Sequence, residues 1–225
     1  MAETRVTLPA EPEPLEVDLA KTGIIIVDMQ NAFLEKGGYS DLLGHDMPRF
    51  RKPITPIQQI SAAGRKKGCP VIYIYVVHHP NDDGGGPESV FWHKEASLKL
   101  YREHPEYKEK LLLPGTWGTK IIKALKPKGN DSLVEKPRYG GFYDTKLETV
   151  LKRFGLRYLL VTGVMTNCCV ESTIRESYVR GYFPILVSDA TANSGPNFIQ
   201  EATLFNVKTF FGWVASTGDI LRILE

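Results

Sequence analysis

Short apolar runs that alternate with longer amphipathic stretches constrain the fold of this chain more than any other feature of its sequence. The runs are rich in β-branched residues and apolar throughout, which is typical of strands buried on both faces of a sheet. We predict strands over Gly23–Val27, Val71–Val77, Ser132–Val134, Tyr158–Thr162, Phe183–Val187 and Val207–Phe211.

The stretches between these runs have the periodicity of helices. In Ile54–Lys67 the apolar residues recur on one face, and Gly68 follows as a stop signal. We predict further helices over Lys120–Leu125, Lys146–Phe154, Asn167–Arg180, Phe198–Phe205 and Ala215–Leu224. Because strands alternate with helices, the pattern predicts βαβ units, and therefore a three-layer α/β/α sandwich around a mostly parallel sheet of about six strands.

The length and composition of the chain indicate one globular domain. The chain has 225 residues, of which 42% are hydrophobic and 24% charged, which is an ordinary globular composition. We expect residues 1–19, which carry three prolines, to form an extended N-terminal arm ahead of this domain. The region Pro80–Pro114 includes Gly84–Gly86 and has no strand periodicity, and a loop of that length is typical of a lid or a binding loop.

Several classes of protein are disfavoured by composition. The net charge is only +2 and no basic stripe occurs, so we expect no nucleic-acid partner. No apolar run has the length of a membrane span, and residues 1–18 lack the apolar core of a signal peptide. The three cysteines form neither a disulfide framework nor a Cys-x-x-Cys pair. We therefore expect a cytoplasmic protein with no membrane partner.

Three reactive side chains follow three different predicted strands. Asp28 comes directly after the predicted strand Gly23–Val27, and Lys136 follows the predicted strand Ser132–Val134. Cys169 lies near the start of the helix predicted after the strand Tyr158–Thr162. Ligands of open α/β sheets bind beyond the carboxyl ends of the strands, so we expect these side chains to converge. A thiolate is a nucleophile that can form a covalent intermediate with a carbonyl, with Asp28 as its base and Lys136 holding Asp28 charged.

Each of these residues also has a purely structural interpretation. An aspartate at a strand end is often only a turn cap. A lysine before proline, such as Lys136, is usually a solvated surface group. Free cysteines such as Cys168 and Cys169 are frequently small core residues. The individual residues leave both interpretations open, and the hypothesis of a site depends on their convergence.

Three longer motifs, taken together and in this order, resemble the isochorismatase-like cysteine hydrolase superfamily. They are Ile26–Phe33, Lys136–Phe142 and Gly163–Thr173, and the resemblance extends from about Gly23 to Leu224. It implies a Rossmann-like fold, a single isochorismatase-like hydrolase domain over residues 20–225, and a catalytic triad of Asp28, Lys136 and Cys169. Cys169 rather than Cys168 matches the nucleophile, because it immediately precedes Val-Glu-Ser-Thr.

The resemblance also implies details of the site and of the assembly. A cis peptide is expected between Val164 and Met165, with the N–H groups of Met165 and Cys169 forming an oxyanion hole. Metal-binding relatives carry an Asp-x-His pair after the second strand, whereas valines stand two residues before His78 and His79 here. We therefore expect neither metal nor cofactor. Homodimers or homotetramers are implied as well.

Further segments resemble the branch of the superfamily that hydrolyses ureido acids in bacterial pyrimidine degradation. They are Gly37–Tyr39, Gly85–Pro87, Phe91–Lys94, Leu204–Asn206 and Thr209–Val214. The likeness implies an amidohydrolase that converts (Z)-3-ureidoacrylate, or its peroxy form, to 3-aminoacrylate and carbamate through a covalent thioester. Val76–Pro80 departs from the Asn-Gly-Trp stretch of that branch. A biuret-like ureide, a carbamoyl amino acid, another small amide or an isochorismate-type enol ether therefore remain alternative substrates.

The substrate contacts are open to two interpretations, because packing explains each residue as well as binding does. An anionic ureido acid needs donors and apolar walls. The candidates in or beside the motifs are Phe33, Tyr39, His93, Tyr139 and Phe142. Arg138 is a candidate partner for a carboxylate. A non-catalytic interaction domain of the same fold is the remaining alternative, and the intact Asp28, Lys136 and Cys169 argue against it.

Overall fold

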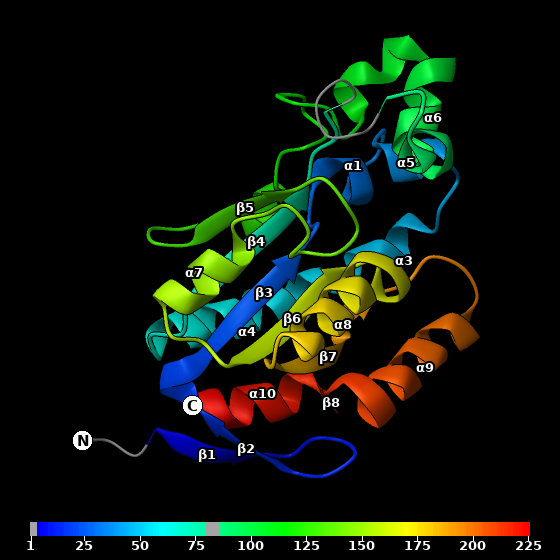
Figure 1. Cartoon of the computed structure of the whole chain (residues 1–225). Helices are drawn as coiled ribbons and strands as arrows, with labels where there is room; N and C mark the ends of the chain where they lie inside the picture. The colour runs from blue at the N-terminus through cyan, green and yellow to red at the C-terminus, as the bar shows by residue number, and fades with distance from the viewer. Residues whose placement is uncertain (1–3, 80–85) are drawn as a thin grey trace.

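A six-stranded sheet forms the centre of the computed structural model, which describes residues 4–79 and 86–225. The predicted residues Pro80–Gly85 of the long loop lie outside this range. The strand order is β5-β4-β3-β6-β7-β8, and all neighbours run parallel (Figure 1). The strands are β3 (Thr22–Val27), β4 (Val71–Val76), β5 (Ser132–Lys136), β6 (Tyr158–Val164), β7 (Phe183–Ala192) and β8 (Trp213–Ala215). The predicted α/β class and parallel sheet are thus confirmed.

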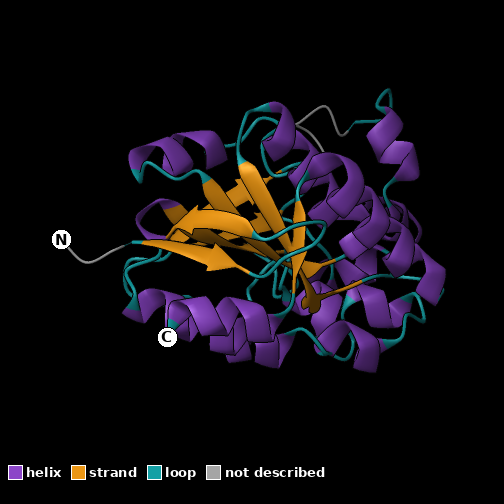
Figure 2. Ribbon diagram, turned by 90° about the horizontal axis from the view of Figure 1, so that it is seen from below, coloured by secondary structure: helices purple, strands orange, loops and turns teal. Residues whose placement is uncertain are grey.

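Helices cover both faces of this sheet, as the view in Figure 2 shows. One face packs against α3 (Met47–Arg51), α4 (Ile54–Lys66) and α10 (Thr217–Leu224). The other face packs against α7 (Leu147–Arg153) and α8 (Glu171–Val179). The longest of these helices, α4, buries Ile57 and Ile60 and ends before Gly68, as its periodicity predicted.

Strand β3 shows why an uninterrupted apolar run is needed at the centre of such a sandwich. Ile24 and Ile26 belong to the cluster with α4 and α10, whereas Ile25 and Val27 belong to the cluster with α7 and α8. All four are fully buried, since successive side chains of a strand point to opposite faces. Each such burial stabilises the fold by about 1.5–3 kcal/mol.

Two predicted elements are wrong. Val207–Phe211 was predicted as a strand, but it is a π-helical turn, η5, that continues α9 (Asn197–Asn206), and the strand β8 starts after Gly212. The turn buries Val207 and exposes Phe210, so its apolar residues are not all directed into a sheet. The helix predicted over Lys120–Leu125 is only the 3₁₀ turn η3 (Lys123–Leu125), because Ile121 pairs with Gln30 in an isolated bridge.

The N-terminal segment forms a β-hairpin of β1 (Arg5–Leu8) and β2 (Leu15–Asp18), followed by the 3₁₀ turn η1 (Leu19–Lys21). Leu8 and Val17 of the hairpin are buried in the cluster that contains α4 and α10. The hairpin therefore packs on the same domain that follows it.

The chain beyond the carboxyl ends of β3 and β4 is folded into short helices. Figure 1 shows α1 (Asn31–Leu34), α5 (Val90–Lys94) and α6 (Ala96–Glu103) at this end of the sheet. The remaining short elements of this part of the chain are α2 (Tyr39–Leu42) and η2 (Pro105–Lys110). Within residues 4–79 and 86–225, every helix is too short or too polar to cross a membrane.

Candidate active site

The structure brings the three predicted catalytic side chains together at the carboxyl edge of the sheet. Asp28 follows β3, Lys136 is the last residue of β5, and Cys169 lies in the π-helical turn η4 (Thr166–Val170) that joins β6 to α8. Lys136 Nζ lies 2.9 Å from Asp28 Oδ2, and both side chains are fully buried. The Cys169 thiol contacts the Asp28 carboxylate as well, and Cys169 is only 4% exposed.

Asp28 is held by its backbone at the point where β3 ends. Its amide donates to the carbonyl of Ile74 in β4 over 2.9 Å, and its φ of 50° lies in the left-handed region that aspartate tolerates better than most residues. Burial raises the pKa of Asp28 above its ordinary value, although the contacts with Lys136 and Cys169 oppose this rise. A carboxylate with a raised pKa is a better proton acceptor.

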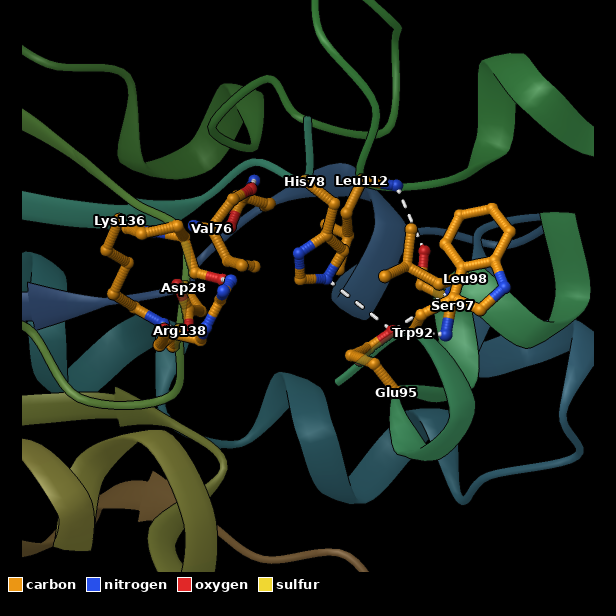
Figure 3. A network of polar contacts seen from close by, with 12 residues as sticks. Asp28, Val76, His78, Trp92, Glu95, Ser97, Leu98, Leu112, Lys136 and Arg138 are labelled. Carbon is orange, nitrogen blue, oxygen red and sulfur yellow. Dashed lines mark hydrogen bonds and ion pairs between the residues drawn. The ribbon is translucent and has the colours of Figure 1, made fainter. Parts of the chain in front are cut away.

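Lys136 is a buried ammonium with two partners. Besides Asp28, its Nζ donates to the carbonyl oxygen of Arg138 over 3.0 Å (Figure 3). Burial lowers the pKa of Lys136, but the negative charge of Asp28, together with that of Cys169 when the thiol is ionised, outweighs burial and leaves this pKa above its ordinary value. The lysine therefore stays charged and compensates a neighbouring anion.

The turn that carries Cys169 depends on Gly163. This residue of β6 pairs with Val27 of β3 and has a φ of +109°. A Cβ atom at this position would lie 2.1 Å from the carbonyl oxygen of Val27, so only glycine allows β6 to approach β3 this closely. The predicted cis peptide between Val164 and Met165 follows and is confirmed.

The two adjacent thiols influence one another. Contact with the Cys168 thiol raises the pKa of Cys169, and burial and the Asp28 carboxylate add to this rise, whereas Lys136 opposes it. The same contact lowers the pKa of Cys168. The Cys169 thiol therefore holds its proton beside a buried carboxylate that can accept it. Cys168 and Val170 donate their amide N–H groups to the carbonyl of Met165, which places the amide of Cys169 in the same turn.

Three of the predicted substrate contacts lie close to this centre. Phe33 and Tyr39 are buried and pack edge to face, with ring centroids 5.3 Å apart. Burial, and then the charges of Glu95 and Cys169, raise the pKa of Tyr39. The pKa of Tyr139 is raised by burial and by the charges of Glu95 and both thiols. Tyr39 and Tyr139 therefore lie within electrostatic reach of the thiols.

The other two candidates, His93 and Phe142, have partners within the protein. The exposed side chain of His93 places its Nε2 2.8 Å from the carbonyl oxygen of Pro87. Phe142 packs against Tyr182 at a centroid distance of 5.9 Å, and the guanidinium of Arg180 lies over its ring. Packing is therefore sufficient to explain both side chains.

Arg138, the candidate partner for a carboxylate, is half-buried. Its guanidinium carbon lies 4.4 Å from the centroid of the Phe91 ring and 5.8 Å from that of Tyr143. The side chain is therefore stacked between aromatic rings beside the loop that follows Lys136.

Two positioning residues were not predicted from the sequence. Gln30 is fully buried, and its side-chain amide is hydrogen-bonded to backbone groups. Its Nε2 donates to the carbonyls of Val76 and Thr119, and its Oε1 accepts from the Val76 amide. Glu176 of α8 accepts from the amide of Phe142 over 2.8 Å and so supports the loop after Lys136. Both act on backbone groups of distant segments, for which a single sequence carries no signal.

A second buried acid–base pair lies next to the triad. His78 Nε2 lies 3.5 Å from Glu95 Oε2, with the two side chains 2% and 6% exposed. Figure 3 shows the His78 ring between Glu95 on one side of the view and Asp28 with Lys136 on the other. Among the described residues no cluster of three or more histidine, cysteine, aspartate or glutamate side chains is arranged to hold a metal ion.

A thiol, a carboxylate and an ammonium at the carboxyl edge of a parallel α/β sheet define a class of protein, the hydrolases that act through a nucleophilic cysteine. Residues 22–219 match the isochorismatase domain family. The chain belongs to this family.

Curated relatives match almost the whole chain. It is 46% identical to a ureidoacrylate amidohydrolase RutB of Methylorubrum extorquens over 95% of this chain and 86% of that protein. It is 42% identical to RutB of Agrobacterium fabrum over 98% of this chain and 97% of that protein. A RutB of Caulobacter vibrioides is 44% identical to this chain, over 95% of this chain and 90% of the length of that protein.

Solved structures share the fold. A cysteine hydrolase from Pseudomonas syringae pv. phaseolicola superposes with a TM-score of 0.77 at 26% identity, over 100% of this chain and 98% of that one. The N-carbamoylsarcosine amidase of Thermoplasma acidophilum gives a TM-score of 0.66 at 23% identity, over 88% of this chain and 96% of the other. The second likeness supports the fold alone.

Proposed function

We propose that this chain is an amidohydrolase that cleaves (Z)-3-ureidoacrylate, or its peroxy form, with Cys169 as nucleophile, Asp28 as base and Lys136 as its charged partner. The observation that carries the proposal is the fully buried Lys136–Asp28 pair, 2.9 Å apart, in contact with the Cys169 thiol. An ion pair is costly to bury, so its position beside a thiol is best explained by chemistry. The names of the curated relatives support the substrate.

The first half of the reaction forms a covalent intermediate. As the Cys169 sulfur attacks the ureido carbonyl carbon, Asp28 accepts the thiol proton, for which its raised pKa suits it. The amides of Met165 and Cys169 would stabilise the oxyanion. When the bond between the carbonyl carbon and the acrylate nitrogen breaks, the proton passes from Asp28 to that nitrogen. 3-Aminoacrylate leaves, and a carbamoyl thioester remains on Cys169.

The second half regenerates the enzyme. Asp28 takes a proton from water, whose oxygen attacks the thioester carbon. Collapse of this intermediate releases carbamate and returns the proton to the Cys169 sulfur. Lys136 keeps its charge throughout, because Asp28 and the thiol hold its pKa above the ordinary value. Its positive charge balances whichever of its two neighbours is the anion.

A substrate panel with cysteine variants tests the proposal. Purified protein is incubated with ureidoacrylate, biuret, N-carbamoylsarcosine and nicotinamide, and the ammonia formed is measured. Ureidoacrylate should be turned over at least tenfold faster than the other three. Cys169→Ala should abolish turnover while preserving the melting temperature.

Cys168→Ala is the matched control, since it removes the neighbouring thiol and should still form a carbamoyl adduct at Cys169 that mass spectrometry detects. Loss of the adduct in Cys168→Ala together with its retention in Cys169→Ala would reverse the assignment. Turnover of nicotinamide alone would refute the substrate.

We further propose that the protein acts in the cytoplasm as a homodimer or homotetramer. Large aromatic side chains are exposed on α8, α9 and η5, and exposed apolar surface of this kind is common at interfaces between subunits. They are Tyr178, Phe198, Phe205 and Phe210. Sedimentation velocity at micromolar concentration should show an assembly that Phe205→Glu disrupts, and a monomeric parent protein would refute this proposal.

A further inference from the structure

His78 lies on the strand between the two charged residues of the triad. The sheet order places β4 between β3, which ends at Asp28, and β5, which ends at Lys136. Val76 is the register partner of Lys136, and His78 follows two residues later. His78 therefore lies beyond the carboxyl ends of β4 and β5, on the side of the sheet where ligands bind.

The ring of His78 is buried with a nitrogen that nothing in the described residues satisfies. Its side chain is 2% exposed, and the Phe91 ring packs edge-on against it at 5.2 Å. Among residues 4–79 and 86–225, Nδ1 has no hydrogen-bond partner, and Nε2 has only the ion-pair contact with Glu95 at 3.5 Å. In Figure 3 Nδ1 is turned away from Glu95, on the side of the view where Asp28 and Lys136 lie. Buried polar atoms are normally paired, so this one is poised for a ligand.

Glu95 determines which kind of partner Nδ1 needs. Its Oε2 accepts from the amides of Ser97 and Leu98, over 2.6 and 3.1 Å, at the start of α6. Burial raises the pKa of Glu95, but the contact with His78 and these amides outweighs burial and lowers it. Glu95 is thus an ionised carboxylate, which accepts and cannot donate. When the imidazole carries a single hydrogen, the contact with Glu95 places that hydrogen on Nε2, and Nδ1 is then an acceptor.

The His78–Glu95 pair belongs to the same site as the thiols. The charge of Glu95 contributes to the raised pKa of Tyr39 and of Tyr139, and it opposes the lowering of the Cys168 pKa. That charge also disfavours a substrate carboxylate at this point. An uncharged part of the substrate that carries N–H groups avoids repulsion by Glu95 and supplies the hydrogen bond that Nδ1 lacks.

We propose that Nδ1 of His78 accepts a hydrogen bond from an N–H group of the substrate, and that Glu95 positions the ring for this contact. The inference rests on the proposed function and adds a basis for selectivity. Ureides and amides supply the donor that the buried acceptor lacks, whereas esters and enol ethers place an oxygen there. A site built to bond an N–H group rejects the analogue without it, because its own polar atom is then left unpaired.

Two analogues of ureidoacrylate test the contact. One replaces the internal N–H with oxygen, and the other replaces the terminal amino group with methyl. His78→Leu should lower kcat/KM for ureidoacrylate by about 10- to 100-fold and should lower it much less for one of the two analogues. That analogue identifies the nitrogen that His78 contacts. Equal losses on all three compounds would overturn the proposal.

Two conservative variants sharpen the test. His78→Asn places an amide oxygen near the position of Nδ1 and should recover much of the loss, whereas His78→Gln reaches toward Glu95 and should not. Equal activities of the two variants would count against Nδ1 as the acceptor. His79→Asn is the matched control, because the neighbouring His79 contacts Glu135 at 2.7 Å on the exposed side of the chain. It should stay within about twofold of the parent.

Glu95→Gln and Glu95→Ala together test the positioning role. The oxygen that accepts from the amides of Ser97 and Leu98 is also the one that lies 3.5 Å from His78 Nε2, so Glu95→Gln should keep both contacts and lose only the charge. Glu95→Gln should therefore keep most of the ureide activity and leave Nδ1 unprotonated in nitrogen NMR, whereas Glu95→Ala frees the ring and should lose that activity. Equal ureide activities of the two variants would refute the role of Glu95.

A binding experiment separates this inference from the proposed function. In Cys169→Ala, which needs no turnover, calorimetry compares the dissociation constants of ureidoacrylate and the two analogues with and without His78→Leu. A preference for N–H donors that depends on His78 supports the inference even if the parent protein turns over no ureide. Turnover of ureidoacrylate without such a preference supports the proposed function and overturns the inference.

Discussion

Replacing Lys136 with methionine should expose the energetic cost of the buried carboxylate beside it. The substitution keeps the length of the side chain and removes the charge 2.9 Å from Asp28 Oδ2. At an effective dielectric constant of about 20, the attraction lost is roughly 6 kcal/mol. Removing one partner of a buried ion pair typically costs about 3–5 kcal/mol of the free energy of unfolding, because the other charge is left uncompensated.

Protonation of Asp28 sets an upper limit to this loss. Burial already raises the pKa of Asp28 above the value of 3.8 for the unfolded chain. Without Lys136 the folded variant should keep a proton on Asp28 that the unfolded chain releases, so the folded state binds more protons and stability falls as pH rises. The slope is about 1.4 kcal/mol per pH unit, which limits the loss to about 4 kcal/mol at pH 7.

Urea denaturation between pH 4.5 and 7.5 measures this behaviour. The deficit of Lys136→Met should shrink steadily as pH falls toward 4.5. The double variant Asp28→Asn with Lys136→Met carries no buried charge and should recover most of the stability at every pH, although it should remain inactive. A deficit that does not change with pH, or a double variant whose loss equals the sum of the two single losses, would refute the reasoning.

Other substitutions test the supports of the site. Gly163→Ala should cost about 2 kcal/mol or more of the free energy of unfolding, because of the positive φ and the close approach to Val27, and should lower kcat more than tenfold. Thermal melting and the ammonia assay measure these two effects, and an unaffected kcat would contradict the positioning role. Gln30→Leu leaves three buried backbone groups unpaired and should cost about 3 kcal/mol in urea denaturation; a loss under about 1 kcal/mol would show that water replaces the amide. Burial raises the pKa of Tyr39, so the stability contributed by its protonated phenol is complete below pH 10 and is lost as pH rises further. Tyr39→Phe should therefore flatten the alkaline decline of the free energy of unfolding, and parallel pH curves for the variant and the parent would contradict this.

The sheet was predictable because its central strands β3, β4 and β6 are buried on both faces. Burial on both faces requires an uninterrupted apolar run, which β3 shows in full and which no surface helix needs. The same criterion failed at Val207–Phe211. There the β-branched and aromatic residues are divided between a buried cluster and the surface, and the chain continues the helix α9 to Gly212. Composition alone does not distinguish these two uses of apolar residues.

The convergence of the three side chains was predictable for a related reason. Asp28, Lys136 and Cys169 each follow a strand of one parallel sheet, and topology brings such positions to one edge whatever lies between them in sequence. His93 and Phe142 lie beside the same motifs and contact Pro87 and Tyr182. Adjacency to a motif therefore places a backbone near the site but does not predict what its side chain contacts.

Glu95 shows what the pattern of strands cannot convey. It belongs to no strand and reaches the site only because the chain between β4 and β5 folds into short helices that return its side chain to His78. Its sequence position carries one cue, since an acid directly before a helix caps that helix, as Glu95 does for α6. Capping accounts for the two amide N–H groups that Oε2 accepts from and leaves the contact of the same oxygen with the imidazole unexplained. The same carboxylate thus has a local role that sequence predicts and a distant role that only the fold creates, and the second decides whether His78 offers the substrate an acceptor or a donor.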